Sequence, residues 1–379
     1  MDQSIQHVLS QYDDQLPLQE ASTIPAPWYT DPRIEELERR AIFGANWQCV
    51  GRVEQVAQPG QYIAVQVAGE PVVVVCGADG KLRAFFNVCR HHAAAVAPEP
   101  GGSVKLFRCP YHGWSYGLDG SLKGTPDFAG VCNFDRAQTG LVPIAVDTWE
   151  QFVFVLLEAP QRSLNKYLGA MVSQAAPLGI SGLRFFESRA YTLNCNWKVF
   201  VDNYLDGGYH VPYLHKGLNS VLDYAEYTIE NGERFCLQSS PMTASEEDAQ
   251  VTATRTGERA YYYWIYPNFM INLYQGVMDT NLVIPMGVDK TKVVFDFYFT
   301  DISVEKQKQN AESVAVSERI QMEDLDICEA VQRGLSSRAY QAGRLSARRE
   351  AGEHLFHRLL AKDLKSGLES FAANGGNSR

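Results

Sequence analysis

Two cysteine–histidine pairs constrain this chain more than any other feature of its sequence. Cys89 and His91 form the first pair, Cys109 and His112 form the second, and 17 residues separate His91 from Cys109. A structural zinc site also takes two Cys and two His, but zinc fingers group like ligands together. One thiolate and one imidazole in each loop is instead typical of a Rieske [2Fe–2S] centre, in which two Cys bind one iron and two His bind the other. The spacing therefore favours an iron–sulfur centre over a zinc site and over chance clustering.

A second group of metal-ligand residues follows further along the chain. Asp202, Asp206 and His210 are spaced by four, so they share one face if a helix continues through them. Ideal helix geometry would turn His215 away, but Pro212 disrupts a helix and lets both imidazoles reach one point. Two imidazoles and one carboxylate with open positions opposite form the facial triad of non-haem Fe(II) oxygenases. The alternative is that both are ordinary core or surface histidines.

The carboxylate of such a triad has its best candidates in a later predicted helix, residues 303–333. Asp324 is the first candidate and Asp326 the second, on a helix whose apolar positions include Ile320, Leu325, Cys328 and Val331. The neighbouring Glu323 is expected to be solvated, as most acids on such a helix are. The sequence thus predicts two metal centres, one with two Cys and two His and one with two His and a carboxylate.

The order of predicted elements indicates an α+β fold. Short strands separated by Gly and Pro turns fill the region from Trp47 to Leu156 and predict an all-β domain. Residues 1–30 are expected to be irregular, and Asp31-Pro32 has the residues of a helix start. Later strands and helices mix, which is typical of α+β. The expected divisions are an N-terminal lead-in and helix packing on the catalytic domain (1–45), a β domain (46–158) and a catalytic domain (159–379). The main later elements are helices at 196–209, 303–333 and 346–371, and strands at 259–273 and 280–300.

Composition excludes several classes of protein. The 379 residues carry a net charge of −10, which argues against binding to nucleic acid, because nucleic-acid binders present basic surfaces. The longest apolar runs are strand-sized, well below the ~18–20 residues of a membrane span. No secretory signal is visible, and eight Cys without a signal do not indicate a disulfide scaffold. We therefore expect a cytoplasmic protein without nucleic-acid or membrane partners.

With these motifs in place, the chain resembles the α subunit of Rieske non-haem iron oxygenases over nearly its whole length. Within that family it is most similar to the choline monooxygenase-like subgroup, in the stretches 28–32, 89–93, 202–213 and 323–335. The resemblance implies an N-terminal Rieske domain and a C-terminal helix-grip domain, whose antiparallel sheet is flanked by helices. It also implies a [2Fe–2S] cluster and a mononuclear Fe(II), the latter on His210, His215 and Asp324.

The resemblance further implies partners and a reaction. Electrons would come from NAD(P)H through a flavin- or ferredoxin-type reductase, and O2 would be used to oxidise a small substrate. Head-to-tail homotrimers would let electrons cross between subunits through a carboxylate. In most members that carboxylate lies three residues before the first iron histidine, where this chain has Gly207. Asp206 is therefore the candidate bridge and Asp202 its alternative, with Asn203 grouped beside them as a third candidate catalytic residue.

The substrate is the least constrained property of the sequence. Residues 261–274 are rich in aromatic side chains, which cage a quaternary ammonium ion through cation–π contacts or simply pack in a core. The first hypothesis is hydroxylation or N-demethylation of a quaternary amine of the choline or betaine type. The alternative is hydroxylation of an aromatic compound, its acid group anchored by Arg184 or Arg189. A non-enzymatic Rieske electron carrier is the remote alternative, because it would make the second metal group vestigial.

Overall fold

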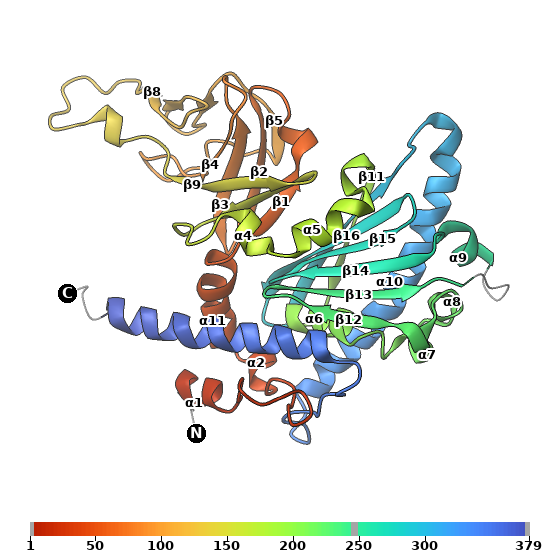
Figure 1. The fold of residues 1–379 in the computed structure, drawn as a ribbon. Coiled ribbons are helices and arrows are strands. Elements are labelled where there is room, and N and C mark those ends of the chain that lie inside the picture. The colour runs from red at the N-terminus through yellow and green to blue at the C-terminus, as the bar shows by residue number, and fades with distance from the viewer. Residues whose placement is uncertain (1–3, 244–248, 376–379) are drawn as a thin grey trace. The chain divides into compact units, whose positions relative to one another are not determined.

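The structure is a computed structural model that describes residues 4–243 and 249–375. It separates into two compact units, one of residues 43–167 and one of residues 1–42 with 168–379. The first unit is dominated by strands, and the second combines one large sheet with helices (Figure 1). The α+β class expected from the sequence is confirmed. Within the described residues, no helix combines the length and the apolar character needed to cross a membrane.

The unit of residues 43–167 contains two antiparallel sheets. Seven strands lie in the order β1-β10-β9-β4-β3-β2-β5, and three short strands lie in the order β6-β7-β8. A turn at Leu118–Ser121 joins β7 to β8, where the Gly117 amide donates to the Ser121 carbonyl. The strands are β1 (Gln48–Arg52), β2 (Gln61–Val67), β3 (Glu70–Cys76), β4 (Leu82–Phe86), β5 (Gly101–Ser103), β6 (Phe107–Arg108), β7 (Ser115–Tyr116), β8 (Leu122–Gly124), β9 (Pro143–Trp149) and β10 (Phe152–Leu156).

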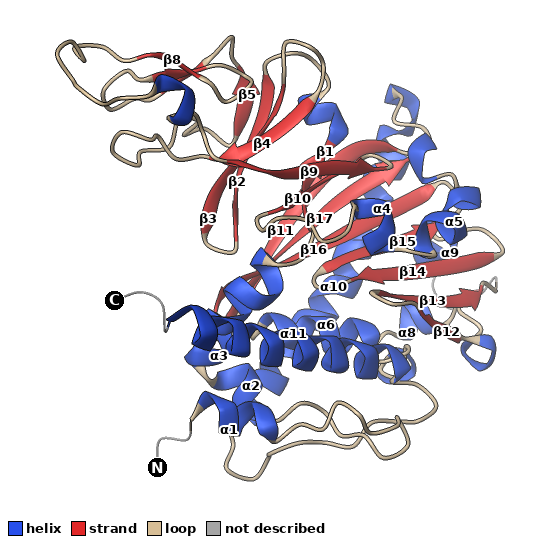
Figure 2. Ribbon diagram, turned by 60° about the vertical axis from the view of Figure 1, so that its left-hand side comes forward, coloured by secondary structure: helices blue, strands red, loops and turns tan. Residues whose placement is uncertain are grey.

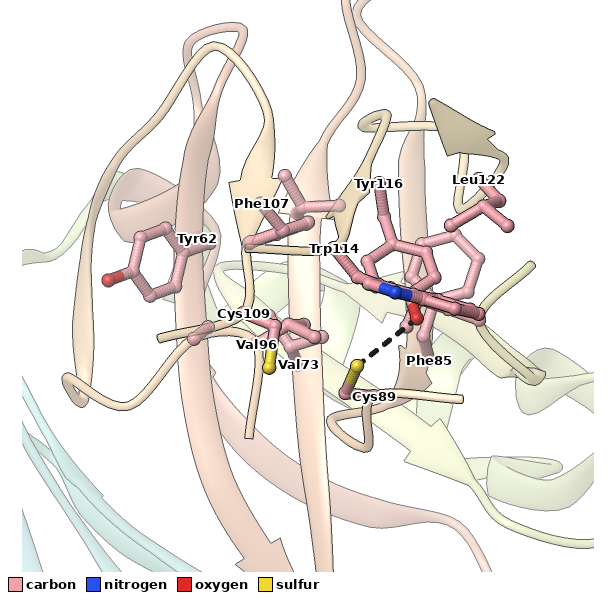
Figure 3. Packing of buried hydrophobic residues seen from close by; sticks show 13 residues of the cluster. Tyr62, Val73, Phe85, Cys89, Val96, Phe107, Cys109, Trp114, Tyr116 and Leu122 are labelled. Atoms are coloured by element: carbon pink, nitrogen blue, oxygen red, sulfur yellow. Dashed lines mark hydrogen bonds between the residues drawn. The ribbon is translucent and has the colours of Figure 1, made fainter. Parts of the chain in front are cut away.

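Strand β3 contributes side chains to two clusters of buried apolar residues in this unit. Its alternate side chains point to opposite faces of the sheet, so Val72 and Val74 pack into one cluster and Val73 and Val75 into the other. All four side chains are fully buried. The cluster with Val73 also holds both cysteines of the predicted iron–sulfur centre (Figure 3). The ligand loops therefore rest directly on the hydrophobic core.

The second unit is built around a seven-stranded antiparallel sheet in the order β11-β17-β16-β15-β14-β13-β12. Helices α6 and α10 contact strands of this sheet, and α11 contacts α6 and β12; Figure 2 shows the helices in blue beside the red strands. The strands are β11 (Arg184–Leu193), β12 (Thr228–Asn231), β13 (Phe235–Pro241), β14 (Arg259–Ile265), β15 (Phe269–Tyr274), β16 (Val277–Gly287) and β17 (Lys290–Phe299). The helices named below are α1 (Ile5–Ser10), α2 (Pro27–Thr30), α3 (Pro32–Glu38), α6 (Trp197–Leu205), α7 (Val211–Leu214), α9 (Ala249–Thr254), α10 (Gln307–Leu335) and α11 (Ala351–Gly375).

The N-terminal segment is more ordered than its sequence predicts. Helix α3 begins where expected, and the Asp31 side chain accepts from the Arg33 amide as its N-cap. The region expected to be irregular, however, contains α1 and α2. Trp28 of α2 is fully buried and its indole donates to the Val8 carbonyl at 3.1 Å. Tertiary packing of this one aromatic side chain orders a segment whose local sequence favours turns.

The helix predicted for residues 196–209 is shorter in the structure, where it is α6. It ends at Leu205 because Gly207 and Gly208 adopt left-handed φ values of +70° and +67°. A Cβ added at Gly207 would lie 2.0 Å from a backbone carbonyl oxygen, that of Arg349. The prediction that Pro212 breaks the helix is wrong, since Pro212 lies in the first turn of α7, where proline is tolerated.

Candidate metal centres and their cavity

The two cysteine–histidine loops are tight turns that start from the core. In the first, the Cys89 amide donates to the Ala94 carbonyl at 2.8 Å. In the second, the Cys109 amide donates to the Trp114 carbonyl at 2.8 Å, and Gly113 takes a left-handed φ of +71°. Both cysteines are buried free thiols, and Figure 3 shows their sulfurs at the same end of the cluster. The two loops thus deliver one thiol each to one region.

The histidines of these loops lie close together at the rim. The rings of His91 and His112 are 4.7 Å apart, and His91 stacks on Trp114 with ring planes 5° apart. Desolvation, with His92 and His112 nearby, lowers the pKa of His91 and favours the neutral imidazole that binds metal. His92, which the spacing leaves outside the ligand set, is exposed. Two buried sulfurs with two imidazoles toward solvent fit a Rieske cluster better than an all-thiolate site.

The second group of predicted ligands meets where the two ends of α7 lie beside the middle of α10. His210 precedes α7, His215 follows it, and Asp324 projects from α10. The Nε2 atom of His215 is 2.9 Å and that of His210 is 3.9 Å from the same Oδ1 atom of Asp324. One ligand atom from each residue lies within 4.8 Å of the others. Asp326, the second candidate, is exposed, so Asp324 is the carboxylate that faces both imidazoles.

Each imidazole of this group is held by a second carboxylate at its other nitrogen. Asp206 Oδ2 lies 2.6 Å from His210 Nδ1, and Glu323 Oε2 lies 2.7 Å from His215 Nδ1. These contacts leave both Nε2 atoms directed at Asp324, the arrangement that metal-binding imidazoles commonly have. The expectation that Glu323 is merely solvated is wrong. Its position beside Asp324 in the sequence was the only signal, and it does not reveal a partner 108 residues away.

Asp202 and Asn203, the other two candidate catalytic residues, point in different directions. Asn203 donates its side-chain amide to Asp324 Oδ1 at 2.9 Å and so helps to fix that carboxylate. Asp202 accepts from the Tyr29 hydroxyl at 2.6 Å and lies 3.0 Å from His357 Nε2. The carboxylate of Asp202 is therefore engaged with α2 and α11, and Asp206 is the acid in contact with His210.

A cavity of about 120 Å³ adjoins the group of His210, His215 and Asp324. Its sheet side is a row of directly opposed residues on adjacent strands, Gln238, Tyr262, Asn272 and Asp279 on β13, β14, β15 and β16. Opposed residues of an antiparallel sheet project to the same face, so this row forms one wall. Four tyrosines line the cavity: Tyr204, Tyr227, Tyr262 and Tyr274.

The aromatic stretch 261–274 therefore divides between two roles. Tyr262 and Tyr274 reach the cavity, with hydroxyls 3.1 Å apart, whereas Tyr263 and Trp264 are fully buried in the core. Neither predicted carboxylate anchor lines the cavity. Arg184 donates to the Ser181 carbonyl, and Arg189 pairs with Glu187 and Glu318.

Two charged residues that the sequence did not single out lie in the cavity wall instead. Arg255 directly follows α9, and Asp279 lies in the middle of β16. Burial raises the pKa of Asp279, and this rise is opposed by the nearby Arg255 charge and by a hydrogen bond from Asn272. An alternating aromatic pattern predicts which strand residues share a face. It gives no sign that a loop arginine joins them.

Comparisons with known proteins agree with this architecture. Residues 46–135 match the model of the Rieske [2Fe-2S] domain, and residues 180–366 match that of the ring hydroxylating alpha subunit (catalytic domain). Choline monooxygenase, chloroplastic, from Arabidopsis thaliana is 40% identical over 373 residues, which is 95% of this chain and 87% of the relative. The carnitine monooxygenase oxygenase subunit of Escherichia coli (strain K12) is 32% identical over 92% of this chain and 95% of its own.

Solved structures give the same result. The crystal structure of the quaternary ammonium Rieske monooxygenase CntA in complex with substrate L-carnitine aligns with a TM-score of 0.79 and 30% identity. The alignment covers 92% of this chain and 99% of that one. A naphthalene 1,2-dioxygenase from Rhodococcus sp. aligns with a TM-score of 0.75 at 21% identity, which reflects the shared fold alone.

Proposed function

This chain belongs to the family of Rieske non-haem iron oxygenase α subunits, and we propose that its substrate is a small quaternary amine that it hydroxylates or N-demethylates. As a family member it is an oxidoreductase that uses a Rieske [2Fe–2S] cluster and a mononuclear iron. One oxygen atom of O2 enters a C–H bond of the substrate, and the other leaves as water after uptake of two electrons and two protons. The electrons come from an external NAD(P)H-dependent reductase.

We assign the ligands of both metal centres to residues whose geometry fits them. The cluster would be held by Cys89, His91, Cys109 and His112 in a domain of residues 46–158. The mononuclear iron would be held by His210, His215 and Asp324 in a domain of residues 159–379, on which residues 1–45 pack. When bound, the iron would activate O2 and the cluster would pass electrons to it. The protein's own part is to hold both Nε2 atoms and one carboxylate toward a single point.

The observation that carries the substrate proposal is the tyrosine-lined cavity beside the iron ligands. The rings of Tyr227 and Tyr262 are stacked 6.5 Å apart with planes at 12°, and that of Tyr274 stands edge-on to Tyr262. Tyrosine faces attract cations by about 0.5–2 kcal/mol each, more when water is excluded. Asp279 adds a buried carboxylate to the same wall. Relatives with choline and carnitine in their names support the same substrate class.

We also propose a homotrimer in which electrons cross between subunits. Asp206 is our candidate for the bridging carboxylate, because its Oδ2 atom already contacts the Nδ1 atom of the iron ligand His210. It lies four residues before that histidine, and the left-handed backbone of Gly207 and Gly208 turns the chain between them. A flavin- or ferredoxin-type reductase as partner, and a cytoplasmic location, complete the proposal.

Substrate-dependent O2 uptake tests the function most directly. The iron-loaded protein, a flavin reductase and NADH are given choline, a series of betaines and a series of aromatic acids, and products are identified by mass spectrometry. We expect O2 uptake with one or more quaternary amines, at one product per O2. A protein without the visible and EPR spectrum of a Rieske cluster, or one that oxidises only aromatic acids, would contradict the proposal. Asp324→Ala, with an intact cluster spectrum, is the inactive control.

A further inference from the structure

The cavity wall carries two opposite charges in addition to the iron ligands. Among the described residues that line the cavity, Arg255 is the one basic side chain of fixed charge, and Asp279 is the one acid besides Asp324. Each is only 4% exposed. Buried charges are costly unless a partner neutralises them, so the partners of these two groups indicate what the cavity is built to hold.

The guanidinium of Arg255 is bound by neutral groups alone. It donates to the Ser313 hydroxyl at 2.7 Å and to the Ser317 hydroxyl, both on α10, and its carbon lies 4.9 Å from the centre of the Tyr274 ring. Within the described residues, no carboxylate oxygen lies within ion-pair distance of it. The two serines fix the guanidinium in place without forming an ion pair with it. A guanidinium held in this way is suited to bidentate binding of a ligand carboxylate.

Asp279 has the complementary environment. Its Oδ2 atom accepts from the Asn272 amide at 2.7 Å, and the Ser317 hydroxyl and the Arg255 charge also favour its ionised form. Among the described residues it forms no direct ion pair, so Arg255 acts on it from beyond ion-pair distance. It stands in the same transverse row as Tyr262, and Tyr274 lies on the next strand. A quaternary ammonium has no N–H to donate, so it is recognised by ring faces and a nearby negative charge rather than by hydrogen bonds.

We propose that the cavity is built for a zwitterion: the substrate's carboxylate binds Arg255, and its quaternary ammonium lies against the tyrosines and Asp279. This inference rests on the proposed function and narrows it from quaternary amines to betaines. A plain cation such as choline would meet the Arg255 charge as a like charge. A plain carboxylate would meet the Asp279 charge in the same way. Only a ligand with both charges brings an opposite charge to each of these two side chains.

Four small ligands of the same shape test this on the unaltered protein. Glycine betaine carries both charges, choline only the positive one, 3,3-dimethylbutanoate only the negative one, and 3,3-dimethyl-1-butanol neither. Isothermal titration of the iron-loaded protein without O2 gives each Kd. We expect glycine betaine to bind at least about tenfold more tightly than each of the other three. Equal affinity for glycine betaine and choline overturns the proposal.

Variants assign the effect to individual side chains. Arg255→Met should raise the Kd of glycine betaine at least about tenfold and leave the Kd of choline unchanged or lower. The preference for glycine betaine over choline is then abolished. Asp279→Asn should raise the Kd of both ammonium ligands, glycine betaine and choline, and should not raise that of 3,3-dimethylbutanoate. Arg189→Met removes the same charge from an arginine outside the cavity and should change no Kd. Equal weakening of every ligand by Arg255→Met means that Arg255 only supports the fold, and it overturns the proposal.

The outcomes also separate this inference from the function on which it rests. If choline is bound and oxidised while betaines are not, the enzyme is a quaternary amine oxygenase and the zwitterion inference is wrong. If no quaternary amine binds or supports O2 uptake, the proposed function itself is wrong. Rieske absorbance and iron content check that each variant is folded. Arg255→Lys, which keeps the charge but not the fork, should retain part of the betaine preference.

Discussion

Removing either partner of the buried ion pair between Lys198 and Glu38 should strongly destabilise the unit that contains the large sheet. Lys198 Nζ lies 2.5 Å from Glu38 Oε1, and the two side chains are 0% and 1% exposed. The pair joins α3 to the first turn of α6, the helix that leads into the iron ligands. Burial raises the pKa of Glu38 and lowers the pKa of Lys198, and in each case the charge of the partner opposes the shift. Each charged form is therefore stabilised by the other.

Lys198→Met removes one charge and leaves the other buried. Breaking a buried pair in this way costs about 3–5 kcal/mol. The Trp197 indole still donates to Glu38 Oε2 at 2.8 Å, which favours the lower end of that range. For a unit of this size, 3 kcal/mol corresponds to a fall in Tm of roughly 6–12 °C. The double change Lys198→Met with Glu38→Gln leaves no unpaired charge and should recover much of the loss.

Thermal unfolding followed by circular dichroism at pH 7 measures these shifts. Arg40→Met is the matched control, because it breaks a surface pair with Glu36 whose side chains are 64% and 53% exposed. That pair should contribute less than about 1 kcal/mol. A Lys198→Met protein within 2 °C of the control, or a double variant no more stable than the single one, would refute the reasoning.

Three further predictions concern the iron site. Asp324→Ala should lower the iron content from about three to about two atoms per chain while leaving the Rieske EPR signal intact, as measured by elemental analysis and EPR. Glu323→Gln should weaken iron binding by about 10–100-fold in a chelator competition, whereas Asp326→Asn, an exposed acid two residues away, should have no effect. Gly207→Ala should reduce both Tm and iron content, because it forces a side chain into left-handed backbone beside a carbonyl oxygen, and Gly182→Ala, with open space around it, is the control.

The motifs of this chain are predictable because they are local. The two Cys–His loops, the predicted start of α3 and the turn before β8 depend on residues a few positions apart. The choice of Asp324 over Asp326 also agrees with the positions of these side chains in the structure. Spacing along a helix or a loop limits where such side chains can point, and the metal chemistry limits the residue types.

The features that sequence reasoning missed all depend on distant contacts. Glu323 has the exposure of an ordinary surface acid and is distinguished only by the imidazole it meets. Trp28 orders the N-terminal segment through a carbonyl 20 residues away. Arg255 enters the cavity because two serines of α10 hold it there, and no periodicity in its own neighbourhood indicates this. Arg184 and Arg189 were plausible anchors by residue type alone. Both lie on the edge strand β11, where Arg184 donates to the Ser181 carbonyl and Arg189 pairs with Glu187 and Glu318.

The row of directly opposed residues that forms the sheet side of the cavity allows the substrate specificity of this fold to change. Gln238, Tyr262, Asn272 and Asp279 come from four different strands, and the residues next to them on each strand face the opposite side. A substitution in the row thus changes the chemistry of the cavity while the packing behind the sheet and the strand register stay intact. Homologues that oxidise different molecules should accordingly diverge along this row while keeping the residues at the alternating positions.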